Sequence, residues 1–264
     1  MTTGNDGYSA LSTDPKGLGE PLGSILGDSP FTAIAVARLL RGQARAYILG
    51  ELPHFRAAVV QTDDAPEEPT GYGADAAALW ELLRGVPGWT CVEVADELAP
   101  ALGELMAQEL GVAVRYYGDL HYALQRPALL WPHPAVRLLA PDDAPLLEAA
   151  PPELRGGGLR LMGARALLAE GYVAAGIVDG RVVATAQLSA RGPRYADIGV
   201  HTLEPYRRRG LCAAAASLVA QAAQAEALTP VWSTGEDNRA SQAAARKVGF
   251  TYVGRMTYVI PQQS

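Results

Sequence analysis

The alternation of apolar and polar residues in the second half of the chain predicts a series of strands and helices. Two apolar runs, Tyr172 to Val178 and Val182 to Leu188, flank Asp179-Gly180, a dipeptide typical of a tight hairpin turn. The next apolar run, Tyr195 to Thr202, predicts a third strand. A helix, a buried strand, a helix closed by Gly249 and a final strand are then expected at Leu211 to Leu228, Pro230 to Ser233, Asn238 to Val248 and Thr251 to Ile260.

A short apolar run and a helix start precede this series. The run covers Val136 to Leu139, and Pro141 begins a helix whose first turn is acidic. A hairpin followed by a strand, helix and strand crossover predicts an α+β sheet with strands of mixed direction.

The first half of the chain repeats such an alternation over shorter segments. Helices are expected at Phe31 to Leu40, Ala74 to Leu83 and Leu98 to Leu110, strands at Ala46 to Leu49, Ala57 to Gln61, Thr90 to Val94 and Val112 to Tyr117, and a polar loop at Asp63 to Gly73. The sequence thus divides into a flexible tail (1–29), an N-terminal α/β domain (30–125), a proline-containing linker (126–134) and a C-terminal domain (135–264).

The composition narrows the class of protein. The chain has 264 residues, enough for two domains, and no apolar run reaches the roughly eighteen residues of a transmembrane helix. The N-terminus also lacks the basic start and apolar core of a secretion signal, so we expect a cytoplasmic protein without a membrane partner. Cys91 and Cys212 are far apart in apolar settings, so neither a disulfide nor a metal site is expected.

Charge is distributed unevenly between the halves. Residues 1–130 carry 8 basic and 17 acidic residues, a net charge of −9, whereas residues 131–264 carry 14 basic and 11 acidic residues, a net charge of +3. The basic residues gather in one turn and do not form a stripe, which argues against a nucleic-acid partner. A single small polyanion is the simpler partner for the basic half.

That basic turn lies between the third strand and the long helix. Arg207, Arg208 and Arg209 precede Gly210, and the alanine-rich helix follows at once. The first amides of a helix have no acceptors within it, and glycine lets an anion approach the backbone closely. The pattern therefore predicts a phosphate-binding turn, with an ordinary solvated helix start as the alternative.

Two motifs resemble those of the GNAT superfamily of acyl-CoA-dependent N-acyltransferases. Arg207-Arg208-Arg209-Gly210-Leu211-Cys212 resembles the family's motif A, Arg/Gln-x-x-Gly-x-Gly/Ala, with cysteine in the last place. Asn238-Arg-Ala-Ser241 followed by Gly249-Phe250 resembles motif B. The resemblance covers roughly residues 135 to 260.

The resemblance implies a fold and a co-substrate. We expect a C-terminal GNAT fold, a mixed and mostly antiparallel sheet flanked by helices, preceded by a smaller, degenerate GNAT-like α/β domain. The co-substrate would be acetyl-CoA or another acyl-CoA, with no metal, and its pantetheine arm would lie in a V-shaped gap between the fourth and fifth strands of the fold. The first half has no phosphate turn, and it would shape the acceptor pocket or only stabilise the protein.

The resemblance also implies which residues contact the co-substrate. The end of the strand would pair with the pantetheine amides, the turn would hold the pyrophosphate, and two residues of motif B would contact the pantetheine or adenosine end. These residues are His201, Thr202 and Leu203, then Arg207, Arg208, Arg209, Gly210, Leu211 and Cys212, and finally Asn238 and Ser241. For Asn238 the alternative is simple capping of the helix. Trp232 is expected in the core, with the acyl pocket wall as its alternative.

Acyl transfer to an amine needs a base, because an alkyl amine is mostly protonated at neutral pH. Asp197 stands where many family members carry a glutamate, and His201 competes with it because imidazole titrates near neutrality. In a regular strand Asp197, Gly199 and His201 share one face.

The acid is less clear than the base. Family members often protonate the departing thiolate with a tyrosine four residues before Gly-Phe, and Ala245 stands there. Tyr252, Tyr258 or water would have to replace it, and of these Tyr258 is our candidate.

Three functions remain open at this point. The first is an N-acetyltransferase that passes an acetyl or short acyl group to a small-molecule or peptide amine by direct attack. The acidic first half would suit a cationic acceptor, if it is more than solvated surface. The second is a degenerate GNAT that binds CoA as a sensor without catalysis, and the third is a purely structural interaction domain. Homodimerisation is left open.

Overall fold

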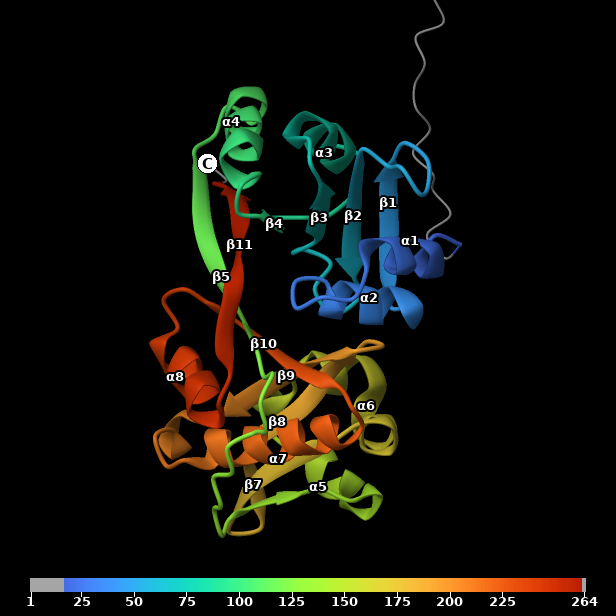
Figure 1. The fold of residues 1–264 in the computed structure, drawn as a ribbon. Coiled ribbons are helices and arrows are strands. Elements are labelled where there is room, and N and C mark those ends of the chain that lie inside the picture. The colour runs from blue at the N-terminus through green and yellow to red at the C-terminus, as the bar shows by residue number, and fades with distance from the viewer. Residues whose placement is uncertain (1–16, 263–264) are drawn as a thin grey trace, which may run out of the picture. The chain divides into compact units, whose positions relative to one another are not determined.

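The computed structural model describes residues 17–262 (Figure 1). The chain divides into two compact units. Unit 1 combines the described residues up to Leu26 with Arg38–Tyr117 and the segment from Met256 onward, and unit 2 combines Gly27–Ala37 with Gly118–Arg255. Both units are therefore discontinuous in sequence, in place of the single break at 126–134 that the sequence suggested.

Unit 1 is an α/β unit built from the first half of the chain and the last strand. Its strands follow the order β1-β2-β3-β4-β11, and its elements are α1 (Gly19–Leu26), the end of α2 (Ala33–Leu40), β1 (Ala44–Leu49), β2 (Ala57–Thr62), β3 (Thr70–Gly73), α3 (Ala76–Leu83), β4 (Val92–Ala95), α4 (Ala99–Leu110), the start of β5 (Val114–Ala123) and the end of β11 (Thr251–Pro261). A core cluster formed by α3, α4 and these strands includes Leu79, Leu102 and Val259.

Unit 2 holds the second half of the chain and the end of β5. Its strand order is β5-β10-β9-β8-β7-β6. Its elements are β6 (Val136–Leu138), η1 (Pro141–Asp143), α5 (Ala144–Glu148), η2 (Pro152–Leu154), α6 (Gly157–Glu170), β7 (Val173–Val178), β8 (Arg181–Arg191), β9 (Tyr195–Thr202), η3 (Glu204–Tyr206), α7 (Leu211–Ala225), β10 (Thr229–Gly235) and α8 (Arg239–Val248).

The two units share one sequence of elements. In each, a hairpin leads to a third strand, then to a helix, a fourth strand parallel to the third, and a second helix. β3 and β4 form the parallel pair of unit 1, and β9 and β10 form that of unit 2. The last strand of each half of the chain joins the sheet of the other unit. β11, from the second half, pairs with β4 of unit 1, and β5, from the first half, pairs with β10 of unit 2.

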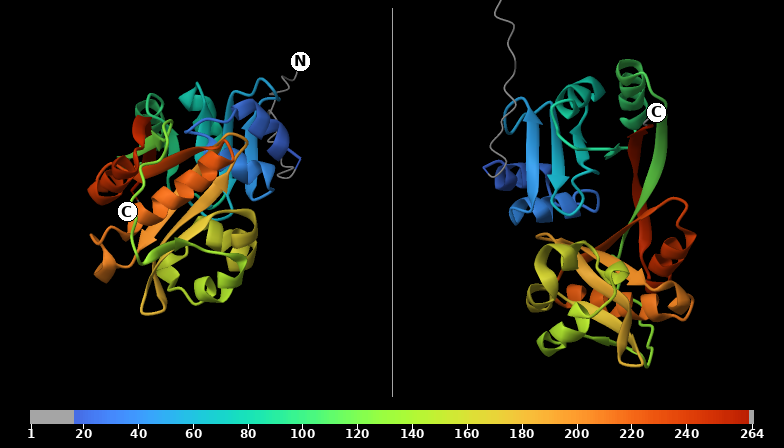
Figure 2. Two further views of the ribbon diagram at one scale, coloured as in Figure 1. Left: turned by 60° about the horizontal axis from the view of Figure 1, so that its bottom comes forward. Right: turned by 180° about the vertical axis from the view of Figure 1, so that it is seen from behind.

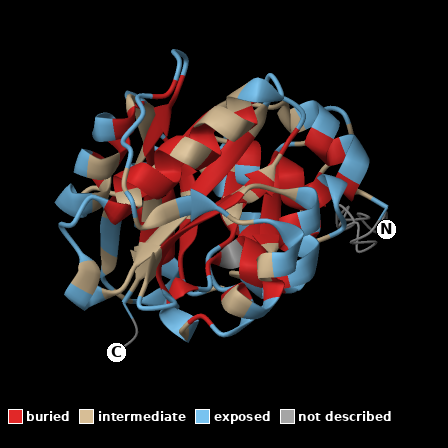
Figure 3. Ribbon diagram, turned by 90° about the horizontal axis from the view of Figure 1, so that it is seen from below, coloured by how far each residue is buried: buried red, intermediate tan, exposed pale blue. Residues whose placement is uncertain are grey.

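Helix α7 forms the centre of unit 2. Its small alanine side chains pack against β8 and β9, where Leu188 and Ile198 belong to the same buried cluster as Ala215 and Ala216. Figure 2 shows α7, in orange, lying along one face of these strands. Figure 3 shows the buried residues inside the ribbon and the exposed ones on loops and outer helix faces. Small residues let a helix approach a sheet closely, and here the buried cluster fills the space between α7 and the strands.

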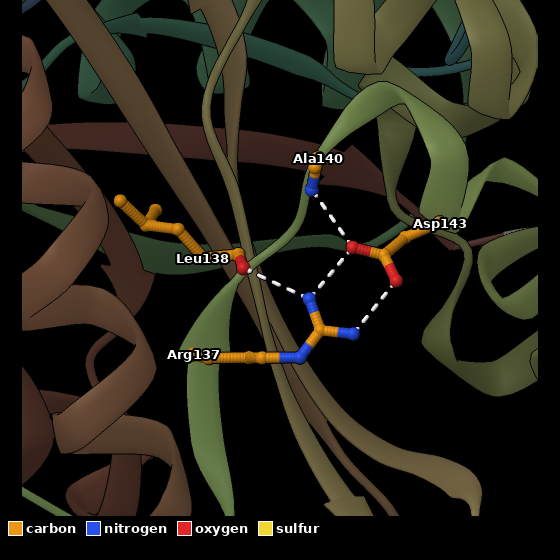
Figure 4. A network of polar contacts seen from close by, with 4 residues as sticks. All are labelled: Arg137, Leu138, Ala140 and Asp143. Atoms are coloured by element: carbon orange, nitrogen blue, oxygen red, sulfur yellow. Dashed lines mark hydrogen bonds and ion pairs between the residues drawn. The ribbon is translucent and has the colours of Figure 1, made fainter.

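The start of the unit 2 sheet is fixed by one ion pair (Figure 4). Arg137 of β6 donates two hydrogen bonds of 2.6 Å to the carboxylate of Asp143, which also accepts the backbone N–H of Ala140 at 2.8 Å. Arg137 and the Ala140 amide lower the pKa of Asp143 to about 2. The pair joins β6 to the turn that begins α5.

Most predicted elements are confirmed, and four local expectations were wrong. Gly19–Leu26, expected in the tail, forms α1, whereas residues 1–16 of that tail lie outside the described residues. Thr70–Gly73, expected as loop, forms β3. Helix α6 was not predicted, because glycines at its start and at Gly163 mask the helical pattern. β5 continues to Ala123 past Gly118, where the prediction ended near Tyr117.

Candidate functional site

Strands β9 and β10 run side by side at their starts and then separate. Their parallel register covers Thr229↔Tyr195 to Val231↔Asp197 and stops there. β9 continues to Thr202, while β10 continues to Gly235 paired with β5 on its other edge. The edge of β9 from Ile198 to Thr202 therefore turns away from β10. Such an edge offers backbone N–H and C=O groups to an extended ligand.

The turn that leaves β9 presents backbone amides to solvent. Arg208 and Gly210 adopt left-handed backbone conformations, with φ of 62° and 84°. The first hydrogen bond of α7 runs from the Ala214 N–H to the Gly210 carbonyl at 3.0 Å, so the amides before Ala214 precede the helical ladder. A left-handed arginine costs about 1 kcal/mol, and such strain is typical of functional turns. The basic, glycine-containing turn that the sequence predicts between a strand and a helix is confirmed, and phosphate binding stays a prediction.

The three arginines of this turn are all exposed. Arg207 Nε donates to the carbonyl of Thr202 at 3.4 Å, which ties the turn to the end of β9. The Arg209 guanidinium lies 5.0 Å from the ring centre of Tyr206, a cation–π contact. Together with the amides and the positive end of the α7 dipole, these charges favour an anion.

The equivalent turn of unit 1 has the opposite character. Asp75 caps α3 and accepts the backbone N–H of Ala77 at 2.9 Å. The N–H groups of Ala78 and Ala77 lower the pKa of Asp75, so its carboxylate stays charged. This negative charge already satisfies the helix start, and it would repel a phosphate. Unit 1 thus has an acidic cap at the place where unit 2 has the arginine turn.

Asp197 lies on the face of β9 opposite α7. It is buried, with 8 % of its surface exposed, and its carboxylate accepts a hydrogen bond from Ser189 Oγ. Ser189 occupies a bulge of β8, where the register with β9 shifts between Leu188 and Ala190. The bulge turns the hydroxyl of Ser189 toward Asp197.

His201 lies on the same face, toward the end of β9. It pairs with Thr185, and Gly199 pairs with Gln187, so the side chains at these positions point to one side of the sheet. The expected common face of Asp197, Gly199 and His201 is confirmed. Burial lowers the pKa of His201, and the positive charge of Arg160 lowers it further, so the imidazole is neutral at neutral pH.

Comparison with known proteins gives a family match for part of the chain. The family model for GNAT acetyltransferase matches residues 168–259, which contain β9, the arginine turn and α7. This segment matches a GNAT acetyltransferase domain. No curated protein matches the chain.

Solved structures share the fold over most of the chain. A GCN5-related N-acetyltransferase-like protein from Streptococcus suis is 18% identical, with a TM-score of 0.65 over 94% of this chain and 100% of its own. A GCN5-related N-acetyltransferase from Kribbella flavida is 17% identical, with a TM-score of 0.64 over 90% and 97%. A tandem GNAT protein from the clavulanic acid biosynthesis pathway is 14% identical, with a TM-score of 0.54 over 97% and 98%. The expected fold class is confirmed.

GNAT-fold proteins use acyl-CoA as co-substrate, and the residues of unit 2 fit such a group. The arginine turn supplies donors and positive charge for a pyrophosphate, and the edge of β9 supplies backbone partners for the pantetheine amides. Thr202 Oγ1 is buried without a hydrogen-bond partner, beside this edge. Burial raises the pKa of the Cys212 thiol to about 11, so this residue presents its amide and a neutral side chain.

The motif B residues of the GNAT domain have structural roles. Asn238 caps α8, because its side chain accepts the backbone N–H of Ser241 at 3.1 Å. Ser241 Oγ accepts Trp232 Nε1–H at 3.0 Å. Trp232 is buried and packs edge-on against Phe250, with ring centres 5.5 Å apart, which confirms its place in the core. The capping role expected as the alternative for Asn238 is therefore present, and contact with CoA stays a prediction.

Both tyrosines considered as the acid, Tyr252 and Tyr258, lie on β11. Tyr258 belongs to unit 1, where it pairs with Glu93 across β11 and β4. Tyr252 is exposed and packs edge-on against Tyr122, with ring centres 5.9 Å apart. Ala245 is fully buried in the α7 core cluster, where a tyrosine would need new space.

Three residues around β9 were missed by sequence reasoning. Gln187 and Ser189 lie on β8 beside His201 and Asp197, and Gly156 packs against Gln187 and His201. The signal was present, because Thr185, Gln187 and Ser189 alternate as polar residues in an otherwise apolar strand. Gly156 had no comparable signal, since its place depends on the fold of a glycine-rich segment.

Among residues 17–262, no helix is long and apolar enough to cross a membrane.

Proposed function

We propose that unit 2 transfers an acetyl or short acyl group from acyl-CoA to the nitrogen of an amine acceptor. The observation that carries the proposal is the separation of β9 from β10 next to the arginine turn, with Asp197 on the adjoining face. In this arrangement the arginine turn would bind the phosphates of CoA, and the free edge of β9 would bind the pantetheine. The carboxylate of Asp197 would bind the acceptor amine. Membership of residues 168–259 in the GNAT family supports this combination.

In this proposal the bound acyl-CoA supplies an activated thioester. The main-chain groups of His201, Thr202 and Leu203 hold the extended arm, and Leu203 N–H is already used by the Val183 carbonyl at 3.0 Å. The pyrophosphate lies against Arg207 to Cys212, with Arg207 and Arg209 as charged donors. Asn238 and Ser241 serve mainly to fix the start of α8.

Asp197 takes the proton of the acceptor amine. Its carboxylate is held by Ser189 and faces away from the alanine core, so it is available on the acceptor side of the strand. The amine nitrogen, once it has lost a proton, attacks the thioester carbonyl carbon, a C–N bond forms and the C–S bond breaks. The attacking nitrogen gives up its second proton, which passes through water to the leaving thiolate, because Ala245 stands where the family often has a tyrosine.

His201 is the second candidate for the base. Its lowered pKa keeps it neutral and able to accept a proton, but its Nδ1 is buried without a partner. Asp197 is preferred because its carboxylate already sits in a directed hydrogen bond.

A second function is a domain that binds CoA without catalysis. The buried Ala245 in place of the usual tyrosine is the observation that favours it. Two measurements separate the candidates: CoA binding, and release of free thiol from acetyl-CoA with a panel of primary amines. Binding with thiol release supports the transferase, and binding with no release across the panel supports the sensor. A protein with neither property contradicts both.

A further inference from the structure

Two buried polar groups on the face of β9 and β8 have no hydrogen-bond partner. Gln187 exposes only 2 % of its surface, and its Nε2 is unpaired. His201 Nδ1, also buried, is unpaired too. Buried polar groups normally have hydrogen-bond partners, because burial without a partner costs the group its bonds to water. Two orphans that face one place therefore point to a missing partner.

Both groups reach the same spot, next to Gly156. A Cβ added at Gly156 would lie 2.5 Å from Gln187 Nε2, 2.8 Å from His201 Cε1 and 3.3 Å from His201 Nδ1. The glycine has an ordinary extended backbone, with φ of −66° and ψ of 176°. The conformation does not require glycine, so the residue is small because Gln187 and His201 fill the volume that a side chain would take.

The neighbouring polar groups on this face are already engaged. Thr185 Oγ1 donates to the Leu154 carbonyl at 3.2 Å, and Ser189 Oγ donates to Asp197. Gln187 Nε2 is a donor only, and neutral imidazole can present an N–H at Nδ1. The positive charge of Arg160 also acts on His201 and contributes to its lowered pKa. Donors and a positive field suit an oxygen that carries negative charge.

We propose that Gln187 and His201 bind a carboxylate of the acceptor, so that the acceptor is an amino acid with the amine and the carboxylate at opposite ends. The inference rests on the proposed function, because Asp197 would take the amine. Asp197 and His201 are four residues apart on β9, which separates their Cα atoms by about 13 Å. The side chains of Asp197 and His201 extend into this distance and shorten it. The amine and the carboxylate of the acceptor must still be several bonds apart, so an ω-amino acid fits better than an α-amino acid.

The test uses matched acceptors that differ only in the carboxylate. Acetyl-CoA is offered with β-alanine, 4-aminobutanoate and 6-aminohexanoate, and separately with ethylamine, propylamine and pentylamine. We expect at least one amino acid to show a KM at least about tenfold below that of its alkylamine, as expected for a charge-assisted bond. In Gln187→Leu that advantage should disappear. An equal advantage in parent and variant, or a preference for the alkylamine in the parent, would overturn the carboxylate subsite.

Gln187→Glu keeps the side-chain shape and replaces the donor with a negative charge. It should invert the preference toward alkylamines, while calorimetric affinity for CoA stays within about twofold of the parent in both variants. If one of these two variants loses its affinity for CoA, we infer that it has not folded. The acceptor preference is then compared between the parent and the other variant.

Binding separates this proposal from the transferase proposal. If no amine is acetylated, calorimetry of 6-aminohexanoate and pentylamine with the CoA-bound parent still tests the subsite. Selective binding of the amino acid that is lost in Gln187→Leu supports the subsite even though the transferase has failed. No binding of the amino acid, as expected if a trapped water alone fills the spot, overturns it.

Discussion

Replacing Gly156 by alanine should block the acceptor side of β9 and leave the cofactor side intact. The backbone at Gly156 already has angles that alanine adopts. A Gly→Ala change at such a position would normally stabilise a protein by about 0.4–1 kcal/mol, because the unfolded chain loses freedom. The new methyl group decides the outcome here.

That methyl group would overlap Gln187 and His201. Its contacts of 2.5 Å with Gln187 Nε2 and 2.8 Å with His201 Cε1 are shorter than real Cβ atoms make, so both buried side chains must move. Overpacking of this kind costs about 1–3 kcal/mol. After the backbone gain, we expect a net loss of about 1–2 kcal/mol and a Tm lower by about 2–8 °C.

The assay pairs thermal unfolding with CoA binding and acceptor kinetics. Gly171→Ala at the other end of α6 is the control, because its Cβ would meet its nearest atom, the Leu167 carbonyl oxygen, at 3.4 Å. Gly156→Ala should raise the KM of the preferred acceptor by at least about tenfold with unchanged CoA affinity, and Gly171→Ala should change neither. Unchanged stability and unchanged acceptor KM in Gly156→Ala would refute the contact geometry described for this glycine.

Three further predictions follow from named contacts. Asp197→Asn should lower kcat about 100-fold or more, with CoA affinity kept, in the thiol-release assay. Asp143→Asn should destabilise the protein by about 1 kcal/mol at pH 7 in urea unfolding. The pKa of Asp143 is lowered to about 2, so this contribution is present above pH 4 and disappears as the pH falls toward 2. Phe250→Ala should cost about 3–5 kcal/mol in the same assay, because Phe250 is buried against Trp232.

Each prediction has an outcome that contradicts it. Full turnover in Asp197→Asn would remove Asp197 as the base. A constant stability difference between Asp143→Asn and the parent from pH 7 to pH 2 would show that Arg137 does not hold a charged Asp143. A loss under about 1 kcal/mol for Phe250→Ala would place this ring outside the core.

The sequence predicted the regular parts of the fold well, because strong periodicity and turn dipeptides are local signals. Asp179-Gly180 marked the hairpin of β7 and β8, and Gly249 marked the end of α8. The exchange of β5 and β11 between the units was beyond local reasoning. Apolar alternation shows that a strand is half buried and does not show which strand lies beside it.

The same contrast between local and long-range signals holds for the residues of the candidate site. The arginine turn and Asp197 were visible because a strand, a glycine and a helix start follow one another along the chain. Gln187, Ser189 and Gly156 come from other segments and meet β9 only through the sheet register and a bulge. Tyr258 was named only as a replacement for the tyrosine missing at Ala245, and the strand exchange puts it in unit 1.

The most direct test of the central claim is a calorimetric titration of acetyl-CoA into the parent and into the double variant Arg207→Ala, Arg209→Ala. Both arginines are exposed, so the double variant should fold like the parent. The control is a second double variant, Arg41→Ala, Arg84→Ala, which removes the same charge from exposed positions of unit 1. Loss of two charge-assisted bonds should raise the Kd at least about 100-fold in the double variant and leave the control near the parent. Equal affinity in all three proteins, or no binding to the parent, would contradict the assignment of the arginine turn as the site for the phosphates of CoA.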